Sequence, residues 1–183
     1  MKIKNNFYNF YKTNFFHKLK KIFYLFKANT GNNIYIGKKV KFLRYTKNLY
    51  IGSNVIFKDY SQICIAEKSG KISIGDNTTI GYYTFIYAKK KIIIGDNCLI
   101  APFVYIIDHD HDIYNKNQIN KSGLICKDII IEPNVWIGTK AIILKGSIIR
   151  SGAVIGAGSV VKGEIPNNAI FAGNPGKIIS YRK

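Results

Sequence analysis

The sequence predicts an all-β fold, a parallel β-helix in which short strands coil into a three-sided prism, and two observations predict it. An aliphatic residue recurs at every sixth position from residue 131 to residue 161, a period typical of neither an α-helix nor a simple alternating strand. Each of the first five of these aliphatic residues is followed, four positions later, by a small or β-branched residue. The three residues between them are turn-formers. Each group of six therefore forms a short strand and a corner, and three groups close one coil. The aliphatic residues are Ile131, Ile137, Ile143, Ile149, Ile155 and Val161.

The same unit recurs upstream and extends the prism towards the N-terminus. Ile51, Ile74 and Ile94 are each followed by glycine, a short polar residue and asparagine, and the aliphatic ladder then resumes. Insertions at 66–71 and 88–91 contain Lys, Glu or Gly and are expected to bulge at corners without breaking the stack. We expect the prism to cover residues 31–180 as one continuous core.

Residues 1–30 lack this pattern and predict a basic amphipathic helical arm. Aromatic and aliphatic residues occur at helical spacing, and most residues between them that carry a charge are lysines. Two interpretations stay open for residues 1–29. The apolar stripe could cap the open end of the prism, or the arm could lie in an anionic membrane interface.

Composition restricts the class of protein. The 183 residues suffice for one domain, and the net charge of +18 raises the question of a nucleic-acid partner. Lysines occur in all segments and no nucleic-acid recognition motif is present, so we expect no nucleic acid. Three cysteines without a CxxC pair and without a secretory signal favour a cytoplasmic location, and Cys98 is expected to be a small buried residue. The sequence has no apolar run long enough to span a membrane.

The ladder is interrupted at 107–129 by a long polar segment that we expect to protrude as a loop. Loops of this length inside a compact domain are usually functional or disordered. This one contains His109 and His111 within an Asp-His-Asp-His-Asp run. A histidine beside carboxylates can accept a proton near neutral pH, which suits deprotonation of a hydroxyl that attacks an acyl carbonyl. The two rings are expected to point to opposite sides.

Two other interpretations of this segment remain open. Alternating His and Asp residues could bind a metal ion, although no third histidine is nearby, and we expect that no metal is required. A solvated acidic turn with incidental histidines would have the same composition.

The order of these motifs resembles the hexapeptide-repeat acyltransferases, and within them the sugar and polysaccharide O-acetyltransferases. The resemblance covers residues 34–180. It rests on the hexads, on the His-bearing loop and on three later motifs. These motifs are Asn134-Val135-Trp136-Ile137-Gly138, Gly156-Ala157-Gly158-Ser159-Val160-Val161 and Ala172-Gly173-Asn174-Pro175. The resemblance implies a left-handed β-helix, a homotrimer with sites between adjacent prisms, and acetyl-CoA as the co-substrate.

The resemblance also implies roles for individual residues. A loop histidine would be the general base, and gap-free counting from Ile100-Ala101-Pro102 favours His111 over His109. The residues implied to line the coenzyme A channel are Trp136, Thr139, Ala157, Gly158 and Lys162, with Lys177 near the nucleotide phosphates. Close relatives carry Arg at this last position, and Lys offers a point charge in place of a bidentate fork.

The function predicted first is acetyl-CoA-dependent O-acetylation of a sugar hydroxyl on a surface polysaccharide or lipid-linked glycan. This protein would be cytoplasmic, with peripheral contact at the inner face of the cell membrane through residues 1–29. Two further hypotheses are an N-acetyltransferase of an amino-sugar nucleotide and a non-catalytic, membrane-associated scaffold. A carbonic anhydrase of the same fold would need a further histidine beyond His109 and His111.

Overall fold

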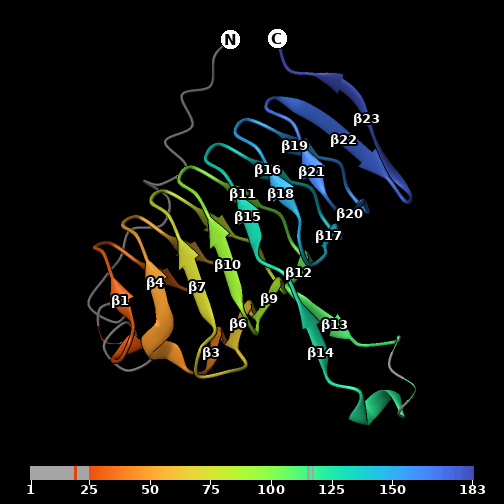
Figure 1. Cartoon of the computed structure of the whole chain (residues 1–183). Coiled ribbons are helices and arrows are strands. Elements are labelled where there is room, and N and C mark those ends of the chain that lie inside the picture. The colour runs from red at the N-terminus through yellow and green to blue at the C-terminus, as the bar shows by residue number, and fades with distance from the viewer. Residues whose placement is uncertain (1–18, 20–24, 115, 117) are drawn as a thin grey trace.

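The computed structural model describes residues 19, 25–114, 116 and 118–183. These residues form a prism of stacked coils, from one corner of which a hairpin protrudes (Figure 1). The predicted parallel β-helix is confirmed, because successive coils pair through parallel strands on three sides. Most of the predicted helical arm lies outside the described residues. Leu25 is helical and is buried in the core at the N-terminal end of the prism.

Three sheets form the sides of the prism, and we name them A, B and C in the order in which the chain enters them. Sheet A consists of β1 (Asn29–Thr30), β4 (Leu49–Ile51), β7 (Lys71–Ile74), β10 (Lys91–Ile94), β15 (Ile129–Ile131), β18 (Ile148–Ile149) and β21 (Glu164–Ile165). Sheet B consists of β2 (Tyr35–Ile36), β5 (Ile56–Phe57), β8 (Thr79–Ile80), β11 (Leu99–Ile100), β16 (Trp136–Ile137), β19 (Val154–Ile155), β22 (Ala169–Gly173) and β23 (Gly176–Tyr181). Sheet C consists of β3 (Lys41–Arg44), β6 (Gln62–Ile65), β9 (Phe85–Ala88), β12 (Tyr105–Ile107), β17 (Ile142–Ile143) and β20 (Val160–Val161).

The six-residue ladder forms the centre of the core, as predicted. Its members from residue 131 to residue 161 expose at most 1% of their surface, and the small partners four residues later expose none. The outward neighbours are more accessible, as with Ile142 beside Ile143. Small residues are required at the partner positions because the chain turns there towards the centre of a narrow triangle.

The corners between sheets A and B explain the recurring Gly-Asp-Asn triplet. A Cβ atom on Gly75 would lie 2.6 Å from the backbone nitrogen of Asp96 in the next coil, so only glycine fits. The backbone N–H of Asp76 donates to Asp96 Oδ1 at 2.8 Å, which ties the coils together. Asn77 has a φ of +55°, a conformation that asparagine tolerates better than most residues.

The two ends of the prism differ. At the N-terminal end, β1, β2 and β3 are the terminal strands of their sheets, paired on one side only among the described residues. At the other end, β22 pairs in parallel with β19 and then antiparallel with β23, which follows after Asn174-Pro175. The sequence did not predict this reversal. No helix in the described stretches is long and apolar enough to cross a membrane.

The ladder predicts how the free energy of unfolding responds to truncation. Ile137→Ala should lower it by about 2–5 kcal/mol, because Ile137 is fully buried and a cavity would remain. Ile142→Ala is the matched control, since that side chain is 37% exposed on the outer face, and should cost less than about 1 kcal/mol. Urea unfolding measures both. Equal losses would contradict the assignment of inner and outer positions.

Candidate active site

The protruding hairpin begins at a buried carboxylate. Asp108 is fully buried and accepts backbone N–H groups from three consecutive residues: Lys89 at 2.8 Å, Lys90 at 2.8 Å and Lys91 at 2.7 Å. Lys89 and Lys90 form the turn between β9 and β10, and Lys91 is the first residue of β10. A buried carboxylate is costly unless hydrogen bonds compensate for lost water, and here three amides do so. Asp108 therefore fixes the point at which the hairpin leaves the prism.

His109 is oriented by the same carboxylate. Its Nδ1 lies 2.8 Å from Asp108 Oδ1, the oxygen that also accepts the backbone N–H of Lys89. The His109 ring meets the ring of Tyr87 edge-on, with centroids 4.7 Å apart, and the residue is only 6% exposed. His109 is thus held in one orientation at the root of the hairpin.

His111 lies farther out on the same hairpin and is exposed. The hairpin consists of β13 (His109–His111) and β14 (Leu124–Cys126), which are antiparallel, and the short helix η2 (Ile119–Lys121) lies in its tip. The expectation that the two rings point to opposite sides is wrong. Residues two apart in a strand share a face, so the rings differ in depth and not in direction.

Ion pairs hold the hairpin against the coils on both sides. The Asp110 carboxylate, on the other face of β13, pairs with Lys145 of the next coil towards the C-terminus. Asp128, where the chain returns to the prism, lies 3.0 Å from Lys90 Nζ of the coil below. The exposed His111 therefore lies on a hairpin that is anchored to the prism near both of its strands.

The His and Asp residues of the hairpin raise the question of a metal site. His109 lies opposite Cys126 in the hairpin pairing, and burial raises the pKa of the Cys126 thiol. Within the described part of the chain, His, Cys, Asp and Glu side chains do not form a group of three that could hold a metal ion.

The coenzyme A channel was implied to be lined by five residues, and four of them lie on sheet B or at its corner with sheet C. Trp136 projects from β16, is 53% exposed and lines a shallow hollow of about 240 Å³ with Leu99 and Pro102. Thr139 lies at the corner, where its Oγ1 donates to the Pro102 carbonyl at 2.7 Å. Ala157 and Gly158 occupy the same corner one coil further on, and the Gly158 N–H donates to the Thr139 carbonyl at 2.8 Å.

The two implied lysines lie near the C-terminal end of the prism. Lys162 lines a hollow of about 390 Å³ together with Pro175 and Gly176. Lys177 belongs to β23 and is exposed opposite Ala172. A Cβ atom on Gly156 would meet the Cβ of Ala172 at 2.8 Å, so Lys177 lies close to the corner that carries Ala157.

One chain does not bring all these residues together. The hairpin leaves at the corner between sheets C and A, where Lys162 also lies, two coils closer to the C-terminus. Thr139, Ala157 and Gly158 lie at the corner between sheets B and C. The face of sheet C separates the two corners. Sequence reasoning missed Tyr87 and Lys145, since neither belongs to the histidine motif and only coil stacking brings them to it.

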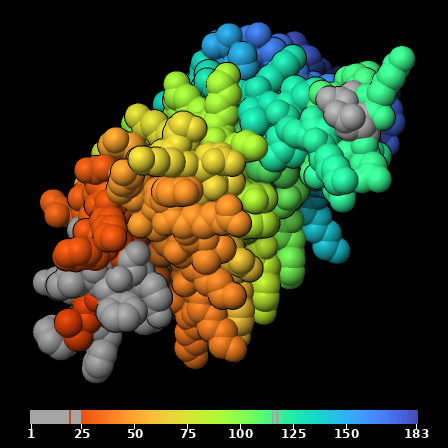
Figure 2. All heavy atoms as spheres, turned by 60° about the horizontal axis from the view of Figure 1, so that its bottom comes forward, coloured from red at the N-terminus to blue at the C-terminus, as the bar shows by residue number. Residues whose placement is uncertain are grey.

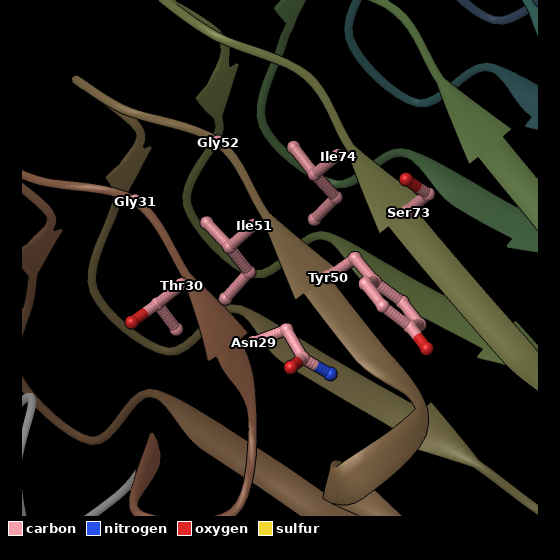
Figure 3. Close-up of a pocket in the computed structure, with 8 residues that line it drawn as sticks. All are labelled: Asn29, Thr30, Gly31, Tyr50, Ile51, Gly52, Ser73 and Ile74. Carbon is pink, nitrogen blue, oxygen red and sulfur yellow. The ribbon is translucent and has the colours of Figure 1, made fainter.

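A larger hollow of about 530 Å³ lies elsewhere, on the outer face of sheet A near the N-terminal end (Figure 3). Asn29, Tyr50 and Ser73 project from this face, and Ile51 and Ile74 point to its other side. None of the implied site residues lines it.

Comparison with known proteins identifies a matching family and similar structures. Residues 128–163 match the family described as bacterial transferase hexapeptide (six repeats). The crystal structure of NeuO, a polysialic-acid-specific acetyltransferase, superimposes with a TM-score of 0.58 at 30% identity and covers 84% of this chain and 82% of that chain. This chain belongs to the hexapeptide-repeat acetyltransferase family.

Other members of the hexapeptide-repeat family differ in what they act on. A point mutant of AntD, an N-acyltransferase from Bacillus cereus crystallised with dTDP and coenzyme A, has a TM-score of 0.77 at 27% identity, over 91% of this chain and 88% of that chain. The polysialic acid O-acetyltransferase of Escherichia coli O1:K1 / APEC is 41% identical over 120 residues, which are 63% of this chain and 38% of the relative. The chain spans about half the length of the curated relatives it matches.

The anchor at Asp108 yields a prediction about local opening of the hairpin. Asp108→Ala should remove the acceptor of three amides, so hydrogen exchange of the Lys89, Lys90 and Lys91 N–H groups should accelerate at least about tenfold. Asp112→Ala is the control, because among the described residues Asp112 accepts the Tyr114 N–H at the exposed tip and no N–H group of Lys89–Lys91. Unchanged protection at Lys89–Lys91 in Asp108→Ala would contradict the anchor.

Proposed function

We propose that this protein transfers an acetyl group from acetyl-CoA to a sugar hydroxyl, with His111 as the general base. The observation that carries the proposal is an exposed histidine on an anchored hairpin, in a family whose members include structures with coenzyme A bound. The acceptor is a surface polysaccharide or a lipid-linked glycan. The polysialic acid O-acetyltransferases among the relatives support a glycan acceptor.

The chemistry requires one base and one oriented thioester. His111 takes the proton of the acceptor hydroxyl while the oxygen attacks the thioester carbonyl. The tetrahedral intermediate then expels the coenzyme A thiolate, which receives that proton from the imidazolium. An acceptor must reach the base, and this favours the exposed His111 over His109, whose ring is enclosed between Asp108 and Tyr87. We assign His109 to positioning the root of β13.

The donor would lie along the corner between sheets B and C. In this proposal Trp136 and Thr139 flank the pantetheine arm, and Ala157 and Gly158 allow close approach, since a Cβ on Gly158 would have no neighbour within 4 Å. Lys177 supplies positive charge for the nucleotide phosphates at the C-terminal end. Lys162, which lies at the corner between sheets C and A, would line the channel from the other edge of sheet C. No metal ion is needed for this reaction.

We propose a homotrimer because one prism separates its base from its donor corner. A neighbouring prism could bring its hairpin to this corner and also cover Trp136 and Leu99, which are 53% and 47% exposed. We further propose a cytoplasmic location with peripheral contact at the inner face of the membrane through residues 1–29, and no nucleic-acid partner.

A second candidate reaction is N-acetylation of an amino-sugar nucleotide. The similarity to AntD, crystallised with dTDP-4-amino-4,6-dideoxyglucose and coenzyme A, favours this reaction over a non-catalytic role. Coenzyme A release in the presence of a polysaccharide or of an amino-sugar nucleotide distinguishes the two reactions. If neither acceptor stimulates release, the non-catalytic scaffold is favoured.

Replacing the base tests the mechanism. His111→Ala should lower the turnover of acetyl transfer by about 10²- to 10⁴-fold while acetyl-CoA binding, measured by calorimetry, stays within a few-fold. His109→Ala should lose several-fold at most, through a less well-ordered hairpin. Near wild-type turnover in His111→Ala together with an inactive His109→Ala would assign the base to His109, and two active variants would eliminate a general base.

Mixing two inactive variants tests the shared site. His111→Ala and Trp136→Arg should each be inactive as homotrimers, and the outward, exposed position of Trp136 should let Arg fold there. When equal amounts of the two variants are reassembled into trimers, each site needs an intact hairpin from one chain and an intact donor corner from its neighbour. Each condition is met in about half of cases, so about a quarter of the sites are intact. About a quarter of wild-type activity is expected, whereas none would place the whole site in one chain.

A further inference from the structure

The charge of this protein is unevenly divided along the chain. Of the 28 Lys and Arg residues, 13 precede Asp59, whereas none of the 10 Asp and Glu residues does. The first 58 residues therefore carry +13 of the net charge of +18. Lysines are indeed spread over the sequence, but carboxylates are missing from its first third.

The described part of this basic third begins with the first coil, which forms one end of the prism. The cations of this coil are all exposed, and they lie around it on more than one side: before β1, at the turn between β2 and β3, on β3, and in the short helix η1 (Thr46–Asn48). They are Lys27, Lys38, Lys39, Lys41, Arg44 and Lys47. We call these six residues the basic rim. Figure 2 shows this end of the molecule in red and orange.

Carboxylates do not neutralise the basic rim. Among the described residues, the ion pairs begin with Glu67 and Lys89 and include none of the six rim cations. The nearest acidic residue in sequence, Asp59, accepts the backbone N–H of Lys38 at 2.9 Å. The Arg44 guanidinium donates to a backbone carbonyl, that of Ala66. A polyanionic partner is what such a surface attracts.

Exposed aromatic side chains occur at the same end. Phe26 is 80% exposed, and Tyr45 and Tyr50 are 39% and 40% exposed. Tyr50 also lines the hollow on sheet A, with Lys71 Nζ 4.3 Å from its ring centroid. Lysines combined with exposed aromatic rings favour a lipid headgroup region, where rings enter the interface and cations meet anionic lipids.

We propose that the basic rim docks end-on against an anionic phospholipid surface, so that the prism stands on its N-terminal end. This rests in part on the proposed function, which gives residues 1–29 a membrane contact, and it adds the first coil of the prism and an orientation. A ring of cations around the end favours this orientation, since a prism lying on one side would need them along a single face.

The orientation sets the height of the hairpin. β1 and β10 are separated by three strand steps in sheet A, and the hairpin leaves the chain between β10 and β15. At about 4.8 Å for each step the hairpin root lies roughly 15 Å above the lipid headgroups. A glycan carried on a lipid would reach His111 after a few sugar units.

Vesicle binding of the full-length protein tests the proposal without any enzymatic reaction. Vesicles of phosphatidylcholine with about 30% phosphatidylglycerol should bind the wild type, and pure phosphatidylcholine should not. The variant Lys38→Gln, Lys39→Gln, Lys41→Gln, Arg44→Gln should bind the anionic vesicles at least about 30-fold more weakly, because each cation near the surface contributes about fivefold. The matched control Lys116→Gln, Lys121→Gln, Lys127→Gln, Lys183→Gln removes the same charge elsewhere and should bind like the wild type.

Equal binding by the rim variant and the wild type would overturn the proposal, and so would an equal loss in the control variant. Tighter binding to a polyanionic oligosaccharide than to the vesicles, lost in the rim variant, would assign the rim to a glycan instead. Because neither acetyl-CoA nor an acceptor is present, failure of the proposed reaction would not affect these results.

The only tryptophan reports on the orientation. Trp136 lies on β16, four strand steps from β2 in sheet B, so it should remain roughly 20 Å from the headgroups. Vesicles containing brominated lipids should therefore bind the protein without quenching Trp136 fluorescence. Strong quenching would show that the prism lies on its side and would overturn the end-on orientation.

Discussion

Every functional position in this chain depends on the register in which one coil lies on the next. Residues 92–94 of β10 pair directly with residues 129–131 of β15, although the hairpin separates them in sequence. The insertion therefore leaves the core ladder in phase, and a slip by one residue would turn every buried isoleucine to the outside. Because the prism keeps its register, chemical groups can be added at corners without disturbing the core.

The few carboxylates are used to maintain this register. Each of the ten Asp and Glu residues has a hydrogen-bond or ion-pair partner within the described part of the chain. Asp76, Asp96, Asp108 and Glu132 accept backbone N–H groups from a neighbouring coil. Carboxylates engaged in this way hold coils together and are less able to neutralise surface lysines, so structure and surface charge are linked.

The sequence predicted the parts of the fold that repeat. The six-residue period placed the buried ladder from Ile131 to Val161, and the burial of these residues follows directly from that period. Alternation along a strand already puts residues two apart, such as His109 and His111, on one face, so the expectation of opposite sides misapplied it. The sequence could not predict that His109 is buried and His111 exposed, because this depends on Asp108 and Tyr87, which pack against His109. The antiparallel strand β23 was also missed, since the six-residue ladder identified in the sequence ends at Val161. Roles for Lys162 and Lys177 came from family resemblance alone, and periodicity offers no signal for them.

The reversed strand β23 has a consequence for self-association. A prism of parallel coils presents unpaired strand edges at each end, and such edges could add further prisms into a growing fibre. On sheet B, the C-terminal edge is already occupied by a strand running in the opposite direction, with its outer residues exposed. An incoming first coil would meet the wrong strand polarity there. The reversed strand therefore interrupts, on sheet B, the parallel stacking that such a fibre would need, whereas sheets A and C end at β21 and β20.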